Sequence, residues 1–237
     1  MKNSILNKLF SLPLRLLLPL RLLLPLPLRL LLLLLLPLLL TGCSLSLFPG
    51  YRPCSATPAS EPESWFATDT GHFLFNTSID IYKKHFSGLM VVKPMPEDNY
   101  RVVFLTEVGI KVFDLEFSAD SAAKVHYMME AMNRKALVNT LSRDISLVLM
   151  NPKSGTIPEC LRQKKSDDLV YLYREKGRKN YYFVRSASDN PYLAKQTGCI
   201  TNKVKARLYG NTESGLDSVQ IRHENIRLSL NLYRIKE

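Results

Sequence analysis

The stretch YRVVFLTEVGIKVFDLEF, residues 100–117, decides the fold class that the sequence predicts. Apolar and β-branched residues dominate the stretch, and Gly109 divides it near the middle. The second half has one face made of Lys111, Phe113, Leu115 and Phe117 and another made of Val112, Asp114 and Glu116. A side-chain period of two is typical of a β-strand with one face against a core. The stretch therefore predicts two antiparallel strands, or one strand broken near Gly109.

Strand signals continue on both sides of this stretch. Residues 73–82 and 85–93 are predicted strands, and Gly88 inside the second predicts a bend or a bulge. Residues 122–132 are ambiguous between strand and helix. The later predicted strands are 169–174, 180–186, 200–209, 218–223 and 226–235.

Residues 134–150 form the predicted helix, which ends before Pro152 and Gly155. Its apolar residues recur at spacings of three and four, as they do on one face of an amphipathic helix. They are Leu137, Leu141, Ile145 and Val148. Strands, a helix and further strands predict an α+β fold that is mainly β. We expect a curved antiparallel sheet, a half-barrel, with helical segments packed on its concave side, in one domain over residues 69–237.

The amino-terminal residues 1–42 have the composition of a leader. They hold five of the 32 Lys and Arg residues and no acidic residue, so 27 basic residues stand against 21 acidic ones in the remainder, a net charge near +6. The longest apolar run without a charge, residues 30–40, is too short for a membrane span, which needs about 20 residues. We therefore expect a signal peptide over residues 1–42.

Leu40-Thr41-Gly42-Cys43 resembles the bacterial lipobox, an apolar residue and two small residues before a cysteine. The resemblance implies cleavage before Cys43 and attachment of diacylglycerol and an N-acyl chain such as palmitate to that residue. An ordinary signal peptide with a chance cysteine is the alternative. The absence of Asp after Cys43 implies, by the same resemblance, an outer-membrane lipoprotein on the periplasmic face.

Residues 43–68 are rich in Ser and Pro and predict a tether with little structure of its own. Beyond Cys43 the cysteines are Cys54, Cys160 and Cys199, so at most one disulfide forms within the chain. If one forms, we expect Cys160 with Cys199, because Cys54 lies in the tether. Three free thiols are the alternative.

The strand pattern over residues 70–237 resembles the LolA/LolB-like lipoprotein carriers and acceptors. This resemblance implies a half-barrel whose apolar interior holds acyl chains or a lipidated partner. The residues that carry it are 86–93, 100–104, 112–117 and 223–228.

The sequence contains few residues in patterns that carry chemistry. His72, His85, His126 and His223 are isolated, and no HExxH, CxxC, GxSxG or glycine-rich phosphate-binding motif is present. We therefore predict no catalytic residue, no metal and no cofactor. Asp114 and Glu116 are two apart on one strand, which suits paired carboxylates but is more typical of a solvated strand face.

Basic residues and tyrosines interleave between residues 162 and 182. Such a pattern occurs in nucleic-acid surfaces, but a periplasmic address argues against nucleic acid, and a solvated hairpin edge is the favoured interpretation. The residues are Arg162, Lys164, Lys165, Arg174, Lys176, Arg178 and Lys179, with Tyr171, Tyr173, Tyr181 and Tyr182.

We expect a non-enzymatic, membrane-anchored lipoprotein of the cell envelope that binds a lipid, an acyl chain or a lipidated protein. A structural or assembly lipoprotein that docks onto an envelope complex is the alternative. A periplasmic hydrolase is a third hypothesis. The partners expected are membrane lipid, through the covalent anchor at Cys43, and an apolar ligand.

Overall fold

The computed structural model describes residues 50–54, 61–67, 71–119, 121–151, 156–166, 168–175, 177–186, 188–198, 202–211 and 213–236. From Gly50 onward these residues belong to one compact unit. Cys43, Cys199 and the expected leader lie outside the described residues. Within the described ranges, no helix is both long enough and apolar enough to cross a membrane.

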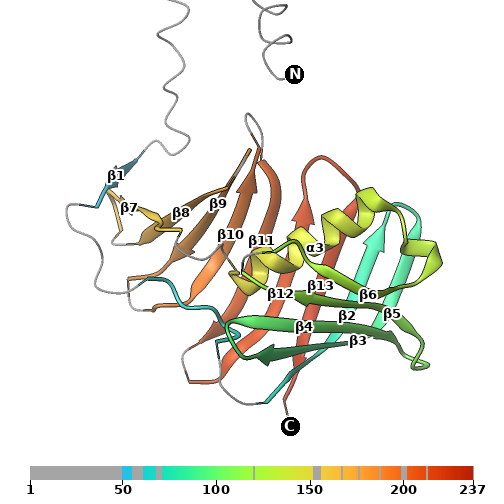
Figure 1. Cartoon of the computed structure of the whole chain (residues 1–237). Helices are drawn as coiled ribbons and strands as arrows, with labels where there is room; N and C mark the ends of the chain where they lie inside the picture. Colours follow the sequence, from blue (N-terminus) through green and yellow to red (C-terminus); the bar gives the residue numbers. More distant parts are fainter. Residues whose placement is uncertain are drawn as a thin grey trace, which may run out of the picture. The chain divides into compact units, whose positions relative to one another are not determined.

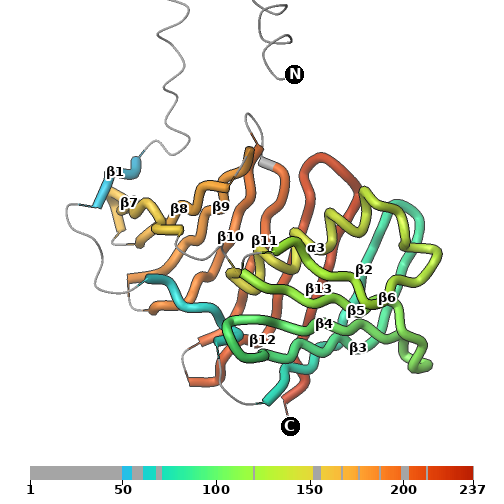
Figure 2. The backbone as a smooth tube through the Cα atoms, viewed as in Figure 1, coloured from blue at the N-terminus to red at the C-terminus, as the bar shows by residue number. Residues whose placement is uncertain are grey.

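One antiparallel sheet organises the described residues (Figures 1 and 2). The strands are β1 (Tyr51–Pro53), β2 (Phe73–Ile81), β3 (Lys84–Met95), β4 (Asn99–Thr106), β5 (Lys111–Phe117), β6 (Lys124–Met128), β7 (Glu159–Gln163), β8 (Leu169–Glu175), β9 (Arg178–Val184), β10 (Pro191–Thr197), β11 (Asn202–Asn211), β12 (Gly215–His223) and β13 (Leu228–Ile235). Their order in the sheet is β1-β7-β8-β9-β10-β11-β12-β13-β2-β3-β4-β5-β6. The sheet is open, with β1 and β6 as its edges, as the predicted fold class requires.

The pairing of β13 with β2 joins two halves of the sheet that are far apart in sequence. Leu230 lies opposite Ile79, and both side chains are fully buried. On one side of this junction lies the meander β2–β6, which we call the first arm. On the other side lie β1 and β7–β12, the second arm.

The alternation of side chains along β2 shows why one face of the sheet carries the core. Phe75, Thr77 and Ile79 are buried, whereas Asn76 and Asp80, whose side chains alternate with these, are exposed. Burial of apolar side chains contributes about 1.5–3 kcal/mol each. The inward side chains of both arms belong to one continuous apolar cluster.

The predicted helix over residues 134–150 is confirmed as α3 (Lys135–Leu149). It lies across one face of the sheet (Figure 1), contacts β10 and β11, and contributes Leu141, Ile145 and Val148 to the core. The helix ends at Met150, which adopts the left-handed conformation typical of a helix C-terminus. The ambiguous residues 122–132 form β6 followed by a 3₁₀ turn, Glu130–Met132.

Gly88 does not mark a bulge, which is one of the two predicted alternatives. Residues pair in continuous register on both sides of it, with Thr77 on β2 and Thr106 on β4. A Cβ atom at Gly88 would lie 1.9 Å from the carbonyl oxygen of Leu105. The glycine is therefore required by the close approach of the β4 backbone.

The folded part begins earlier than residue 69, so the predicted tether is wrong for two segments. β1 pairs with β7, with Arg52 opposite Arg162. Phe66 is 1% exposed in the core, and the Trp65 indole donates a hydrogen bond to the Pro191 carbonyl (2.7 Å). These segments resemble a tether in sequence because Pro and Ser separate a few apolar residues that nevertheless pack.

Candidate functional site

A pocket of about 360 Å³ lies where residues of the two arms meet α3. We call it the seam pocket. Its walls are the β5–β6 connection between Phe117 and Val125, the face of α3 that carries Val138 and Arg143, and the β8–β9 hairpin at Glu175 and Arg178. Pockets that bind small molecules have volumes of roughly 300–1,000 Å³, so this one has the size of a binding site.

One helical face supplies the α3 wall of the seam pocket. Val138, Ser142 and Ser146 line it and follow one another at intervals of four residues, which places them on one side of a helix. The adjoining row is Asn139 and Arg143. The core residues Leu141, Ile145 and Val148 lie on the neighbouring side of the helix, and Val138 at the boundary also packs against the core.

The first arm gives the seam pocket its apolar part. The lining residues here are Phe117, Ala122, Ala123 and Val125, and Val138 adds to them from α3. Val125 is 43% exposed although it lies on a strand. An exposed apolar side chain inside a concave, partly polar wall is typical of a binding surface.

Two arginines form the charged part of the seam pocket, Arg143 from α3 and Arg178 from the start of β9. Partial burial and the neighbouring charge of Arg178 lower the pKa of Arg143, against the opposite effect of Asp144. Within the described residues, no hydrogen bond or salt bridge joins either guanidinium to a side chain. Glu175 also lines the pocket and accepts a hydrogen bond from the Asn180 amide (3.2 Å).

A buried acid–base pair fixes α3 on the sheet beside the seam pocket. The Nε2 atom of His223 on β12 lies 2.6 Å from Oδ2 of Asp144, and the side chains are 5% and 1% exposed. Burial raises the pKa of Asp144, while the hydrogen bond with His223 acts to lower it. Neither residue lines the seam pocket, so the pair positions the helix and does not meet a ligand there.

The sequence contained a signal for this pair that the prediction missed. Asp144 sits in the apolar row of the predicted helix, between Leu141 and Ile145. A charged residue on a core-facing row requires a buried partner. The partner, His223, is 79 residues away in sequence and could not be identified from sequence spacing.

Two other described histidines pair with a carboxylate at the surface of the sheet. His85 pairs with Asp80 (2.6 Å) and His126 with Glu116 (2.6 Å), while His72 is exposed. In the described ranges no three His, Cys, Asp or Glu residues form a group able to hold a metal.

Asp114 and Glu116 belong to an ion-pair network, so the solvated-face interpretation is wrong for Asp114. Asp114 is 5% exposed, and Arg101 donates to it from Nη2 (3.1 Å) while Lys111 donates from Nζ (3.1 Å). The Arg101 hydrogen bond holds the pKa of Asp114 below its usual range. A carboxylate held ionised by two cations is a structural group and a poor proton donor.

The basic stretch is not a hairpin edge. β8 and β9 lie inside the sheet, between β7 and β10, and Arg174 binds Glu159 through both carboxylate oxygens (2.9 Å from Nη2 to Oε2). The four interleaved tyrosines, 171, 173, 181 and 182, are 2–4% exposed. Buried rings cannot stack on bases. Of the predicted basic residues, the structure places Arg178 in the seam pocket.

The disulfide joins Cys54 to Cys160, with Cα atoms 5.5 Å apart. The predicted pairing of Cys160 with Cys199 is therefore wrong, because Cys160 already has a partner. The prediction failed because Cys54 was assigned to the tether, whereas it follows β1 at the sheet edge. Its backbone N–H donates to the Cys160 carbonyl (3.1 Å).

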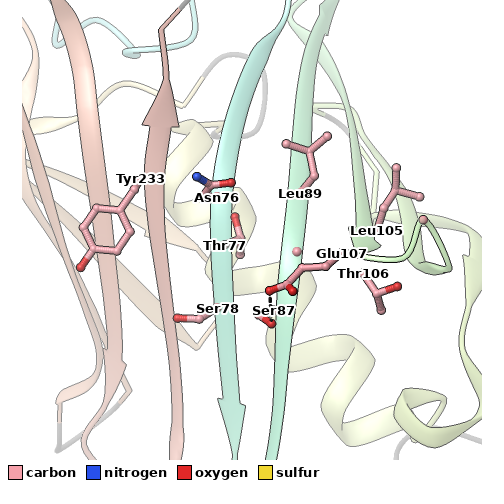
Figure 3. Close-up of a pocket in the computed structure, with 11 residues that line it drawn as sticks. Asn76, Thr77, Ser78, Ser87, Leu89, Leu105, Thr106, Glu107 and Tyr233 are labelled. Carbon is pink, nitrogen blue, oxygen red and sulfur yellow. Dashed lines mark hydrogen bonds between the residues drawn. The ribbon is translucent and has the colours of Figure 1, made fainter.

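A second hollow, of about 650 Å³, lies over β13, β2, β3 and the β4–β5 turn (Figure 3). Gly88 leaves its floor without a side chain, and Tyr233, which is 54% exposed, stands at one side. Ser87 donates a hydrogen bond to Glu107 (2.8 Å) across it. Most of its lining residues are small or polar, but apolar atoms make up the larger part of its surface, and its one carboxylate is already engaged. The seam pocket is the better candidate because it sets two arginines beside an apolar wall.

Comparison with known proteins gives distant similarities in structure. No family model matches the chain, and no curated protein matches it. A LolA superfamily protein from Nitrosomonas europaea is similar in structure, with 12% identity and a TM-score of 0.44 over 72% of this chain and 87% of that one. A DUF1329 family protein from Desulfovibrio piger has 11% identity and a TM-score of 0.43 over 70% and 83%. Similarities of this degree say nothing about a ligand or an activity.

Proposed function

We propose that this chain is a non-enzymatic, membrane-anchored envelope protein whose half-barrel binds an acyl chain or another apolar group in the seam pocket. One observation carries the proposal: the seam pocket combines an apolar wall with two arginines that form no side-chain hydrogen bond or salt bridge among the described residues. An amphiphile, apolar at one end and polar at the other, has complementary chemistry.

The packed core supports the choice of the seam pocket over the interior of the half-barrel. The inward side chains Phe104, Phe113 and Leu115 of the first arm are fully buried. On the second arm Ala206 and Val219 are buried to the same extent. A ligand that lies along the pocket wall gains about 0.8 kcal/mol for each CH₂ that it buries. Binding there needs no rearrangement of the core.

The proposed anchor is Cys43, carrying acyl groups that hold the protein at the periplasmic face of the outer membrane. The lipobox resemblance supports this part of the proposal. The test is metabolic labelling with a tritiated fatty acid in cells that express the full chain. Label should appear on the protein and disappear in Cys43→Ala. Equal labelling of the two would refute the anchor.

Ligand binding is tested by titrating the purified full chain with an environment-sensitive fluorescent fatty acid. Val138→Trp fills the apolar wall and should weaken binding by at least tenfold. Val108→Trp is the matched control, because Val108 is 80% exposed in the β4–β5 turn and lies outside the seam pocket. Equal binding by all three proteins would refute the proposed site.

A second candidate function, docking onto an envelope complex, rests on the exposed edge strand β6. Val125 and Tyr127 are each 43% exposed on this strand, and β6 ends the sheet. An uncovered edge can accept a strand from another chain. In this case Tyr127→Lys would abolish cross-linking to a neighbouring envelope protein while fatty-acid binding stays unchanged.

A further inference from the structure

The two arginines of the seam pocket line the same cavity although their charges repel, and the charge of Arg178 lowers the pKa of Arg143. Arg143 projects from α3, and Arg178 begins β9, so two separate elements bring them to one pocket. Neighbouring cations raise the free energy of the folded state, and the single carboxylate in the pocket lining, Glu175 opposite Arg178 on the β8–β9 hairpin, offsets only part of this repulsion. An anion between the two arginines removes this repulsion and forms charge-assisted hydrogen bonds with both guanidinium groups.

The remaining polar groups of the seam pocket suit an anion with several oxygens. On α3, Asn139, Ser142 and Ser146 line the pocket beside Arg143 and provide amide and hydroxyl donors. The other charged group in the lining is Glu175, whose carboxylate accepts a hydrogen bond from Asn180. Asp144, the other carboxylate near Arg143, points to His223. The lining therefore carries two positive charges against one negative charge.

We propose that Arg143 and Arg178 bind the phosphoryl group of an anionic amphiphile whose apolar part lies against Val125 and Val138. The proposal deepens the proposed function and rests on it for the apolar part of the ligand. Phosphate is favoured over carboxylate because a phosphoryl group, even as a diester, offers two charged and two ester oxygens in a tetrahedral arrangement. It can therefore accept from two guanidinium groups and from hydroxyl groups at once.

The test compares three probes on the purified full chain in an uncharged detergent, by isothermal titration calorimetry. Dihexanoyl phosphatidylglycerol carries both chemistries, 1-octanoylglycerol carries only the apolar part, and inorganic phosphate carries only the anion. Arg143→Gln and Arg178→Gln remove one guanidinium each. Arg207→Gln, on the exposed surface of β11, is the control for net charge.

Each pocket variant should raise the Kd for dihexanoyl phosphatidylglycerol about tenfold or more. Arg207→Gln should leave it within twofold, and no variant should change the Kd for 1-octanoylglycerol. Arg143→Lys should recover part of the loss, because it restores the charge but not the two-pronged geometry. Thermal unfolding that is unchanged in the variants shows that they are folded.

Two results would overturn the proposal. If both amphiphiles bind equally and the arginine variants change neither Kd, the pocket takes an apolar group but no phosphoryl group, so the proposed function survives alone. If no probe binds, both fail. Binding of inorganic phosphate that depends on both arginines, without binding of 1-octanoylglycerol, supports the anion site and refutes the apolar part.

Discussion

Replacing His223 with Ala should reveal the largest single polar contribution to the attachment of α3. The substitution leaves the Asp144 carboxylate 1% exposed and without its hydrogen-bond partner at 2.6 Å. Breaking a buried pair by removing one partner costs about 3–5 kcal/mol. We expect a loss of this size in the free energy of unfolding at pH 7. His85→Ala is the control, since the His85–Asp80 pair is more than half exposed and should contribute about 0.2–1 kcal/mol.

The loss in His223→Ala should depend on pH in a defined direction. Burial raises the pKa of Asp144, and removing His223 also removes an influence that lowers it. A carboxyl group with a raised pKa in the folded state favours folding below its unfolded pKa, near 3.9. This contribution disappears as the pH rises through the folded pKa. The deficit relative to wild type should therefore shrink as the pH falls from 7 towards 4.

Urea unfolding followed by tryptophan fluorescence measures this loss directly. Trp65 is the only tryptophan of the chain, and it packs against the core. The double variant Asp144→Leu with His223→Leu should recover most of the stability, since an apolar pair of similar size replaces a buried ion pair at little cost. A deficit below about 1 kcal/mol in His223→Ala, or one that is independent of pH, would refute the reasoning.

Three further predictions concern other parts of the domain. Gly88→Ala should lower the free energy of unfolding in urea by about 3 kcal/mol, because its Cβ would collide with the Leu105 carbonyl. Gly109→Ala, where space is open, should lower it by about 1–2 kcal/mol from its backbone conformation alone. Equal losses would contradict the steric argument. Cys160→Ala should lower the free energy of unfolding by about 2–5 kcal/mol under oxidising conditions. Peptide mapping of the wild type without reductant should recover Cys54 linked to Cys160, and a Cys160–Cys199 peptide would contradict the structure. Asp114→Asn should lower the free energy of unfolding by about 1.5–3 kcal/mol at pH 7. This loss should disappear as the pH falls below 3.8 and through the depressed pKa of Asp114. A loss that persists at pH 2 would mean that the charge of Asp114 is not its origin.

Local patterns predicted the elements of this fold well. The alternation over residues 73–82 and the spacing of apolar residues over 134–150 correspond to β2 and α3, because side-chain period depends only on backbone geometry. The split near Gly109 also corresponds to the turn between β4 and β5. These features need no information about distant residues.

Contacts between distant residues were not predictable in the same way. The disulfide depends on β1 reaching β7, and no local pattern in a segment rich in Pro and Ser indicates this. The seam pocket requires β5, α3 and β9 to meet, which follows from the pairing of β13 with β2 and from the position of the helix. Arg143 and Arg178 therefore became a pair only in three dimensions.

The most direct test of the central claim is to locate a bound apolar group. A fatty acid with a photoreactive diazirine at its tail, irradiated in complex with the purified full chain, marks the residues that it touches, and mass spectrometry of the digested protein identifies them. The account predicts labels on residues 117–125 and 138–146, which Val138→Trp abolishes. Labels confined to the hollow around Gly88 and Tyr233, or labels that Val138→Trp leaves unchanged, would contradict it.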